Sequence, residues 1–391
     1  MYSGYSERAG ADEMLTLILK ATNACNLRCL YCSVGDKSRE MKMSEKRMSE
    51  ALEWFAGYAE GRGEKKIEII FHGGEPLLIE AGQYRRCIER LAARYPHLVV
   101  RFCVQTNGYY ITQEHVRLFV DYGMQAGISV DGSEYVHDEQ RISITGKETY
   151  STIMKNIRML KERGVPVSLL MVLTRNGLNG NLHFLENFAR EDLPLKINPL
   201  LPEGEAVNHK ELYLEQGEYG EYLIRVFNYL IDHDLNLTVS PLEQMLYGVI
   251  FHQPPRGCVF TKECSRFFLS INAAGEIYPC GRFADSGKFC LGTIDSGITE
   301  KGREKLDQLY ERRCRTLPED CTNCSFGDLC SGGCSAACQY GDLSRPSSIC
   351  GDYQKIFRYL YGDGLKKYRQ YLLKKREDII SLLKERKEYG V

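Results

Sequence analysis

The stretch Cys25-Asn26-Leu27-Arg28-Cys29-Leu30-Tyr31-Cys32 places three cysteines within eight residues, in the spacing C-x3-C-x2-C. Three thiolates are one fewer than a structural zinc site or a cubane iron–sulfur cluster normally takes. A cluster held by three thiolates leaves one iron open to a small molecule. The motif follows an apolar run at 15–21, where a ligand-binding loop after a first strand is expected. The alternative is a surface loop with incidental thiols, or half of a zinc site.

Short apolar β-rich runs alternate with amphipathic helical patterns from residue 14 to about residue 200. The expected strands are 15–21, 67–71, 99–105, 125–130, 165–173 and 195–199. The expected helices are 45–60, 83–94, 113–122, 150–163 and 181–190, followed by 219–233. This alternation predicts an α/β fold with a parallel sheet wound into a full or partial barrel, whose ligand loops follow the carboxyl ends of the strands. The run 211–219 is either a lid or an amphipathic helix, and we favour the helix.

Composition narrows the partners and the compartment. The 51 basic and 52 acidic residues give a formal net charge of −1, which offers no support for a nucleic-acid or membrane partner. The N-terminus has no apolar targeting segment, so a cytoplasmic location is expected. Eleven of the sixteen cysteines lie between Cys258 and Cys350. Since the cytosol keeps thiols reduced, metal binding explains them better than disulfides do.

Composition also suggests three regions. Cysteine and glycine dominate after Gln253-Pro254-Pro255-Arg256-Gly257, where large apolar residues are too few for an ordinary core. We expect a barrel at 1–235, a metal-stapled domain at 236–352 and a charged helical tail at 353–391. The tail is read as a helix that packs one face on the body rather than as a binding arm.

The three-cysteine motif, with Tyr31 before its last cysteine, resembles the radical S-adenosylmethionine (radical SAM) superfamily. The resemblance implies a partial (β/α)6 TIM-like barrel and a [4Fe–4S] cluster on Cys25, Cys29 and Cys32, whose open iron chelates SAM. It is strengthened by the strand-end motifs His72-Gly73-Gly74-Glu75-Pro76, Gln105-Thr106-Asn107-Gly108, Ser129-Val130-Asp131-Gly132 and His137-Asp138-Glu139-Gln140-Arg141.

The same resemblance assigns contacts to SAM. Gly73, Gly74 and Glu75 would hold the methionyl amine, while Ser129 and Arg141 would hold the carboxylate, which suits a guanidinium. Tyr31 is counted among the cofactor-binding residues. For Asp131 and His137, a ligand role and a structural role as turn residue and cap remain equally open.

The C-terminal cysteines resemble the SPASM extension of radical SAM enzymes, which holds two auxiliary [4Fe–4S] clusters. The family's crossed ligation implies one cluster on Cys258, Cys264, Cys280 and Cys334, and a second on Cys321, Cys324, Cys330 and Cys350. Two zinc ribbons are the alternative. Cys338 competes with Cys334, and the x3 spacing after Cys330 favours Cys334. The cysteines outside every motif are Cys87, Cys103, Cys290 and Cys314.

The resemblance also implies an activity, an oxidoreductase in which a 5′-deoxyadenosyl radical abstracts hydrogen from a precursor peptide. In anaerobic sulfatase-maturing relatives an aspartate catalytic base follows the cysteine equivalent to Cys280, whereas Gly281 stands here. We therefore expect a maturase of ribosomally made peptides that forms a thioether or carbon–carbon crosslink. Formylglycine formation or another peptide oxidation is the enzymatic alternative, and a non-catalytic iron–sulfur or zinc redox-sensing scaffold is the alternative of another class. Expected partners are the peptide, an electron donor such as flavodoxin or ferredoxin, and a separate peptide-recognition protein.

Overall fold

The computed structural model describes residues 14–34, 41–255 and 257–388, with side chains described as far as residue 377. Six parallel strands form the centre of the sheet in the order β1-β3-β4-β5-β7-β8. They are β1 (Leu15–Thr22), β3 (Lys66–Gly73), β4 (Val99–Thr106), β5 (Gln125–Ser129), β7 (Val167–Leu173) and β8 (Leu195–Pro199). The six predicted strands and the partial (β/α)6 barrel are confirmed.

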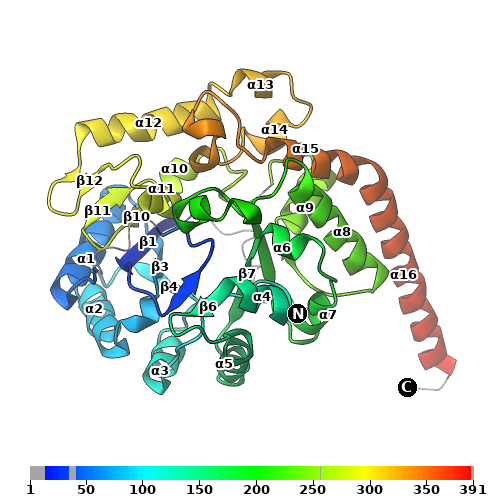
Figure 1. Cartoon of the computed structure of the whole chain (residues 1–391), viewed down its shortest axis with the longest axis horizontal. Helices are drawn as coiled ribbons and strands as arrows, with labels where there is room; N and C mark the ends of the chain where they lie inside the picture. Colours follow the sequence, from blue (N-terminus) through cyan, green and yellow to red (C-terminus); the bar gives the residue numbers. More distant parts are fainter. Residues whose placement is uncertain (1–13, 35–40, 256, 389–391) are drawn as a thin grey trace.

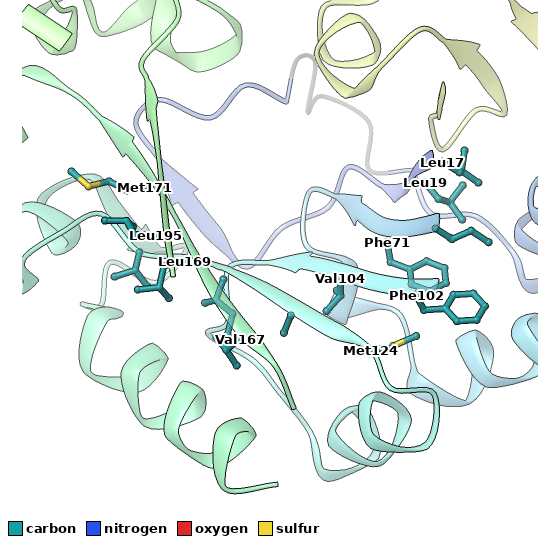
Figure 2. Close-up of a cluster of buried hydrophobic side chains, with 14 of the residues drawn as sticks. Leu17, Leu19, Phe71, Phe102, Val104, Met124, Val167, Leu169, Met171 and Leu195 are labelled. Atoms are coloured by element: carbon teal, nitrogen blue, oxygen red, sulfur yellow. The ribbon is translucent and has the colours of Figure 1, made fainter. Parts of the chain in front are cut away.

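Helices cover the outer face of this sheet (Figure 1). The main ones are α1 (Glu45–Gly61), α2 (Ala81–Arg94), α3 (Gln113–Asp121), α5 (Tyr150–Glu162), α7 (Phe184–Arg190) and α8 (Glu218–Asp232), with short α4 (Glu134–Gln140) and α6 (Arg175–Leu178) between them. Apolar side chains at alternate strand positions build the core beneath them, including Leu17 and Leu19 on β1 and Leu169 and Met171 on β7 (Figure 2). Because successive side chains of a strand point to opposite faces, the remaining side chains of these strands face the barrel interior.

The sheet continues beyond the barrel at both edges. β9 (Val239–Ser240) pairs with β8, and β10 (Phe268–Ile271) pairs in parallel with β1. β11 (Glu276–Tyr278), β12 (Gly292–Thr293) and β13 (Gly297–Ile298) follow in antiparallel order, giving eleven strands. The sequence analysis did not predict these strands, because each is only two to four residues long and most lie among cysteines and glycines. The cysteine-rich region therefore shares a sheet with the barrel.

Short helices carry the rest of the cysteine-rich region. They are α9 (Leu242–Phe251), α10 (Cys264–Phe267), α11 (Gly281–Ser286), α12 (Glu300–Cys314), α13 (Glu319–Thr322), α14 (Gly327–Cys330) and α15 (Cys350–Tyr359). α15 packs on α8, where the backbone N–H of Gly220 donates to Asp352 Oδ1 at 2.8 Å. A π-helical turn (Leu360–Gly364) joins α15 to α16 (Leu365–Glu388), which runs along the side of the molecule (Figure 1).

The helix favoured at 211–219 is wrong. A 3-10 turn (Lys210–Leu212) and a loop occupy most of that run, and α8 begins only at Glu218. Gly217, with φ of +92°, precedes α8 and stops the helical pattern from extending backward. Within the described part of the chain, no helix is both long and apolar enough to cross a bilayer.

Candidate active site at the barrel mouth

The three-cysteine loop, residues 25–32, is fixed against the mouth of the barrel, which we define as the carboxyl ends of the six strands. β2 (Leu27–Cys29) pairs antiparallel with β6 (Arg141–Ser143), and this register sets Cys29 opposite Arg141. Burial raises the pKa of the Cys29 thiol to about 12, Arg141 opposes that rise, and Cys32 and Cys25 add to it. The three thiols and one guanidinium therefore lie close together.

Two glycines bring the end of β3 directly onto the backbone that leads into Cys25. The N–H of Gly74 donates to Thr22 O and that of Glu75 to Ala24 O, both at 2.7 Å. A Cβ added at Gly74 would lie 2.2 Å from Ala24 O, and Gly73 has a φ of +130°. Only glycine fits this backbone-to-backbone approach. The glycine pair thus sets the position of the loop.

The Glu75 side chain ties β3 to the end of β4. Its Oε1 accepts hydrogen bonds from Thr106 Oγ1 at 2.7 Å and Leu77 N at 2.9 Å, and its Oε2 accepts from Asn107 N at 2.8 Å. The side chain is fully buried, and burial raises its pKa to about 6. The carboxylate therefore already has three partners within the protein, and the contact of Glu75 with the methionyl amine of SAM stays a prediction.

A buried network links Tyr31 to the ends of β5 and β7. The Tyr31 hydroxyl donates to Asp131 and accepts from Arg141 Nη1 at 2.5 Å. Asp131 also accepts from Gln140 Nε2 and from Val172 N, each at 3.0 Å. Asp131 is therefore fully used by protein groups, so its role is structural. Tyr31 thus connects the three-cysteine loop to Asp131 and Arg141.

Two further predicted residues lie near the network. His137 is completely buried, its Nδ1 accepting from Asp131 N at 3.2 Å and its Nε2 lying 3.0 Å from Thr149 Oγ1, so its role is also structural. Ser129, at the end of β5, accepts from Gln105 Nε2 at 3.3 Å and is 9 % exposed. Arg141 Nε is buried and has no hydrogen-bond partner. A buried, unpartnered guanidinium nitrogen beside the thiols is a ready donor for an anionic ligand.

The C-terminal thiols gather in two places. Cys321, Cys324, Cys330 and Cys350 together line a cavity of about 20 Å³ that is closed by aromatic side chains. In the other group, Cys334 raises the pKa of both Cys280 and Cys264, and Cys258 also raises that of Cys264. Arg313 Nη1 donates to Cys264 Sγ at 3.3 Å. The thiols thus gather in the two sets that the resemblance implies, and their assignment as cluster ligands stays a prediction.

Cys338 lies beside the first of these groups, and its Sγ is 3.9 Å from Cys334 O. Cys87 is bonded instead to Ser49 Oγ at 3.3 Å, and Cys290 and Cys314 lie against backbone carbonyls. In the described ranges, no three or more His, Cys, Asp or Glu side chains are arranged to hold a single metal ion.

Sequence reasoning missed a buried ion pair at the mouth. Lys20 near the end of β1 pairs with Asp285 of α11, and their side chains are 7 % and 9 % exposed. The available signal was Lys20 itself, a charged residue inside the otherwise apolar run Leu-Thr-Leu-Ile-Leu-Lys-Ala-Thr. Its partner is 265 residues away, and no local pattern indicates that pairing.

Comparisons with known proteins agree with this geometry. Residues 19–180 match the radical SAM superfamily. The serine-type anaerobic sulfatase-maturating enzyme of Klebsiella pneumoniae is 26% identical over 342 residues, covering 85% of this chain and 84% of the relative. The cysteine-type enzyme of Clostridium novyi is 26% identical over 328 residues, covering 81% and 87%.

Solved structures share the fold. The structure of native anSMEcpe with bound AdoMet and Kp18Cys peptide superposes with a TM-score of 0.78 at 22% identity, covering 90% of this chain and 98% of that one. Streptococcus suis SuiB bound to its precursor peptide SuiA gives a TM-score of 0.59 at 14% identity, covering 88% and 78%. These two likenesses concern the fold alone.

Proposed function

We propose that this chain, whose residues 19–180 match the radical SAM superfamily, is a radical SAM enzyme related to the anaerobic sulfatase-maturating enzymes, and that it oxidises a cysteine or serine side chain of a peptide to the aldehyde of formylglycine. The observation that carries the proposal is homology to serine-type and cysteine-type enzymes over more than four-fifths of the chain. The crosslinking reaction expected from the residues after Cys280 gains no support from these comparisons. The oxidising alternative is favoured instead.

Cys25, Cys29 and Cys32 would hold the SAM-binding [4Fe–4S] cluster. Their convergence and the unpartnered Arg141 Nε fit a cluster with an anionic ligand beside it. Arg141 and Ser129 would bind the SAM carboxylate, and the backbone of Gly73, Gly74 and Glu75 would receive the amine. When bound, cluster and SAM supply a 5′-deoxyadenosyl radical. The chain's own residues orient that group: Tyr31 and Asp131 hold the loop, and the glycine pair sets its distance from β3.

The two C-terminal thiol groups would hold auxiliary [4Fe–4S] clusters, one on Cys258, Cys264, Cys280 and Cys334, the other on Cys321, Cys324, Cys330 and Cys350. The position of Cys334 next to Cys264 and Cys280 supports it over Cys338 as the fourth ligand. Four thiolates for each cluster suit electron transfer. The enzyme would work in the cytoplasm with a flavodoxin-like or ferredoxin-like reductant, and a separate recognition protein would deliver the peptide if the barrel alone binds it weakly.

The test is product analysis with anaerobically reconstituted enzyme, SAM, dithionite and the Kp18Cys peptide or its serine counterpart. We expect an aldehyde that reacts with a hydrazide probe. From cysteine the product loses sulfur and two hydrogens and gains one oxygen, while from serine it loses two hydrogens. Replacing Cys25, Cys29 and Cys32 by alanine should abolish SAM cleavage yet keep the iron of the auxiliary clusters. A product that loses two hydrogens, retains sulfur and is silent to the probe would instead support a thioether crosslink.

A further inference from the structure

One carboxylate at the barrel mouth contacts both the cysteine-rich region and the three-cysteine loop. Asp285 lies on α11, which begins directly after Cys280, and Figure 1 shows α11 close to β10 and β1. One oxygen of Asp285 pairs with Lys20. The other accepts a hydrogen bond at 3.0 Å from Ser33 Oγ, directly after Cys32. Asp285 therefore connects the residue after Cys32 to the helix that follows Cys280.

The glycine after Cys280 explains how this pair fits. A Cβ added at Gly281 would lie 3.5 Å from Lys20 Cε and from two carbons of Ile18. A carboxylate side chain at position 281 would extend beyond that Cβ and compete with Lys20 for space. With glycine there, the Lys20 side chain passes the start of α11 and its ammonium reaches Asp285, one helical turn further along the same helix. The carboxylate absent at position 281 is thus present at the same mouth from position 285.

His72, Glu203 and Arg282 are ionisable groups around the Lys20–Asp285 pair. His72 lies opposite Lys20 in the strand register. Burial, together with Lys20, lowers the His72 pKa to about 4, so this imidazole is neutral, and its Nδ1 accepts from Gly73 N at 2.7 Å. Burial raises the pKa of the neighbouring Glu203. Arg282, from α11, offsets part of that rise.

We propose that Asp285 is the base that takes the substrate's proton during oxidation, and that Lys20 is the positioning residue that holds it. The inference rests on the proposed function. The proton acceptor would then be a carboxylate one helical turn beyond Gly281. Ser33, which is exposed, gives the accepted proton a route to solvent.

With SAM and the clusters bound, the cofactor would supply a 5′-deoxyadenosyl radical, which would take one hydrogen atom from the substrate Cβ and leave as 5′-deoxyadenosine. The remaining carbon radical would form a second bond to its oxygen or sulfur as the O–H or S–H bond breaks. The proton would pass to Asp285, and the electron would pass to a one-electron oxidant of the [4Fe–4S] class, held by the cysteines of the Cys280 group. Serine would yield the aldehyde directly, while cysteine would yield a thioaldehyde that water converts to the aldehyde and hydrogen sulfide.

Asp285→Asn tests the assignment in reconstituted holoenzyme with the serine peptide deuterated at Cβ. Deuterium should still appear in 5′-deoxyadenosine, because hydrogen abstraction precedes proton transfer. The ratio of aldehyde to 5′-deoxyadenosine should fall about 100-fold, the usual size of a general-base contribution. Peptide affinity measured by calorimetry should change less than about twofold. Asp285→Glu should recover part of the ratio.

The matched control is Asp295→Asn. Asp295 also bridges the cysteine-rich region to the barrel, through Arg47 at 2.5 Å, but it is exposed and far along the sheet. It should leave the ratio unchanged. If Asp285→Asn loses iron, the double variant Lys20→Met with Asp285→Leu removes the buried pair without stranding a charge. The same loss of ratio is expected of that variant.

A wild-type ratio in Asp285→Asn, or in the double variant, overturns the assignment. The assignment is also overturned if the ratio of aldehyde to 5′-deoxyadenosine falls in Glu203→Gln but not in Asp285→Asn, since Glu203 would then be the base. Wild-type enzyme that transfers no deuterium from Cβ and makes no aldehyde would contradict the proposed function itself. This outcome can be told apart from a failure of the Asp285 assignment, because it is measured on the wild-type enzyme alone.

Discussion

His137 is enclosed behind the three-cysteine loop in a setting that only the neutral imidazole satisfies. Its Nδ1 accepts from Asp131 N, so its Nε2 carries the proton toward Thr149 Oγ1, which in turn donates to Arg141 O at 2.6 Å. Burial, aided by the Arg141 charge, lowers the pKa of His137 to about 2. Protonation would remove the acceptor that Asp131 N needs and would place a cation beside Arg141.

This buried imidazole predicts an acid-sensitive fold. A histidine with a depressed pKa stabilises the native state above its unfolded value near pH 6.5, and that stability is lost as the pH falls below it. The free energy of unfolding should drop by about 1.4 kcal/mol per pH unit between pH 6.5 and 5 from this residue alone. Urea unfolding of wild type and His137→Asn at several pH values measures the slope.

Exposed His97 supplies the control for that slope. It pairs with Glu60 at the surface, so His97→Asn should leave the pH dependence as it is in wild type. The variant His137→Asn should flatten the curve, since asparagine keeps an acceptor oxygen but does not titrate. An identical slope in wild type and His137→Asn would contradict the assignment of the acid sensitivity to this residue.

Among elements, the end of β3 controls the loop that carries the first three cysteines. Gly74→Ala would push a methyl group into Ala24 O and displace the backbone before Cys25. We expect the variant to lose the iron of the SAM-binding cluster and the ability to bind SAM. It should keep the iron of the two auxiliary clusters. Iron analysis and equilibrium binding of SAM measure this. Gly61→Ala is the control, because nothing lies within 4 Å of a Cβ there. A Gly74→Ala protein with full iron and normal SAM affinity would show that the loop tolerates the shift.

The elements also show what the sequence could predict. The barrel strands were found because each is a largely apolar run of five or more residues that alternates with a helical pattern, and glycine-containing motifs mark the ends of β3, β4 and β5. The membership of the two cysteine groups came from the resemblance to the SPASM extension, since each implied set joins cysteines that lie far apart in the sequence. β10 was not, because a four-residue strand has too few positions to show a period, and its pairing with β1 is made across 252 residues. The Lys20–Asp285 pair escaped for the same reason: spacing carries no information about partners so far apart.

At the scale of the whole molecule, the barrel depends on the cysteine-rich region for one edge of its sheet. Four residues of β1, Thr16 to Leu19, pair with β10, and Ser270 Oγ donates to Ile18 O at 2.8 Å. α15 covers α8 with buried Tyr353, Ile356 and Phe357. In contrast, α16 pairs with the body through surface contacts such as that of Lys367 with Asp232 at 2.7 Å. The expected tail at 353–391 therefore begins inside α15, whose buried side chains belong to the body, and only α16 beyond Gly364 is held mainly at the surface.

Truncation after residue 235 and truncation after Gly364 should give opposite results. A chain ending at residue 235 would bare the β1 edge and the apolar face of α8, so it should aggregate, as unpaired edge strands do. A chain ending at Gly364 would lose exposed ion pairs worth about 0–1 kcal/mol each, together with part of a side-chain packing surface, so it should remain monodisperse with a modestly lower Tm. Size-exclusion chromatography and thermal unfolding of both chains measure the difference. A soluble, cooperatively unfolding 1–235 fragment would mean that the barrel folds without its eleven-stranded sheet, and aggregation of the 1–364 chain would mean that α16 contributes more than its surface pairs indicate.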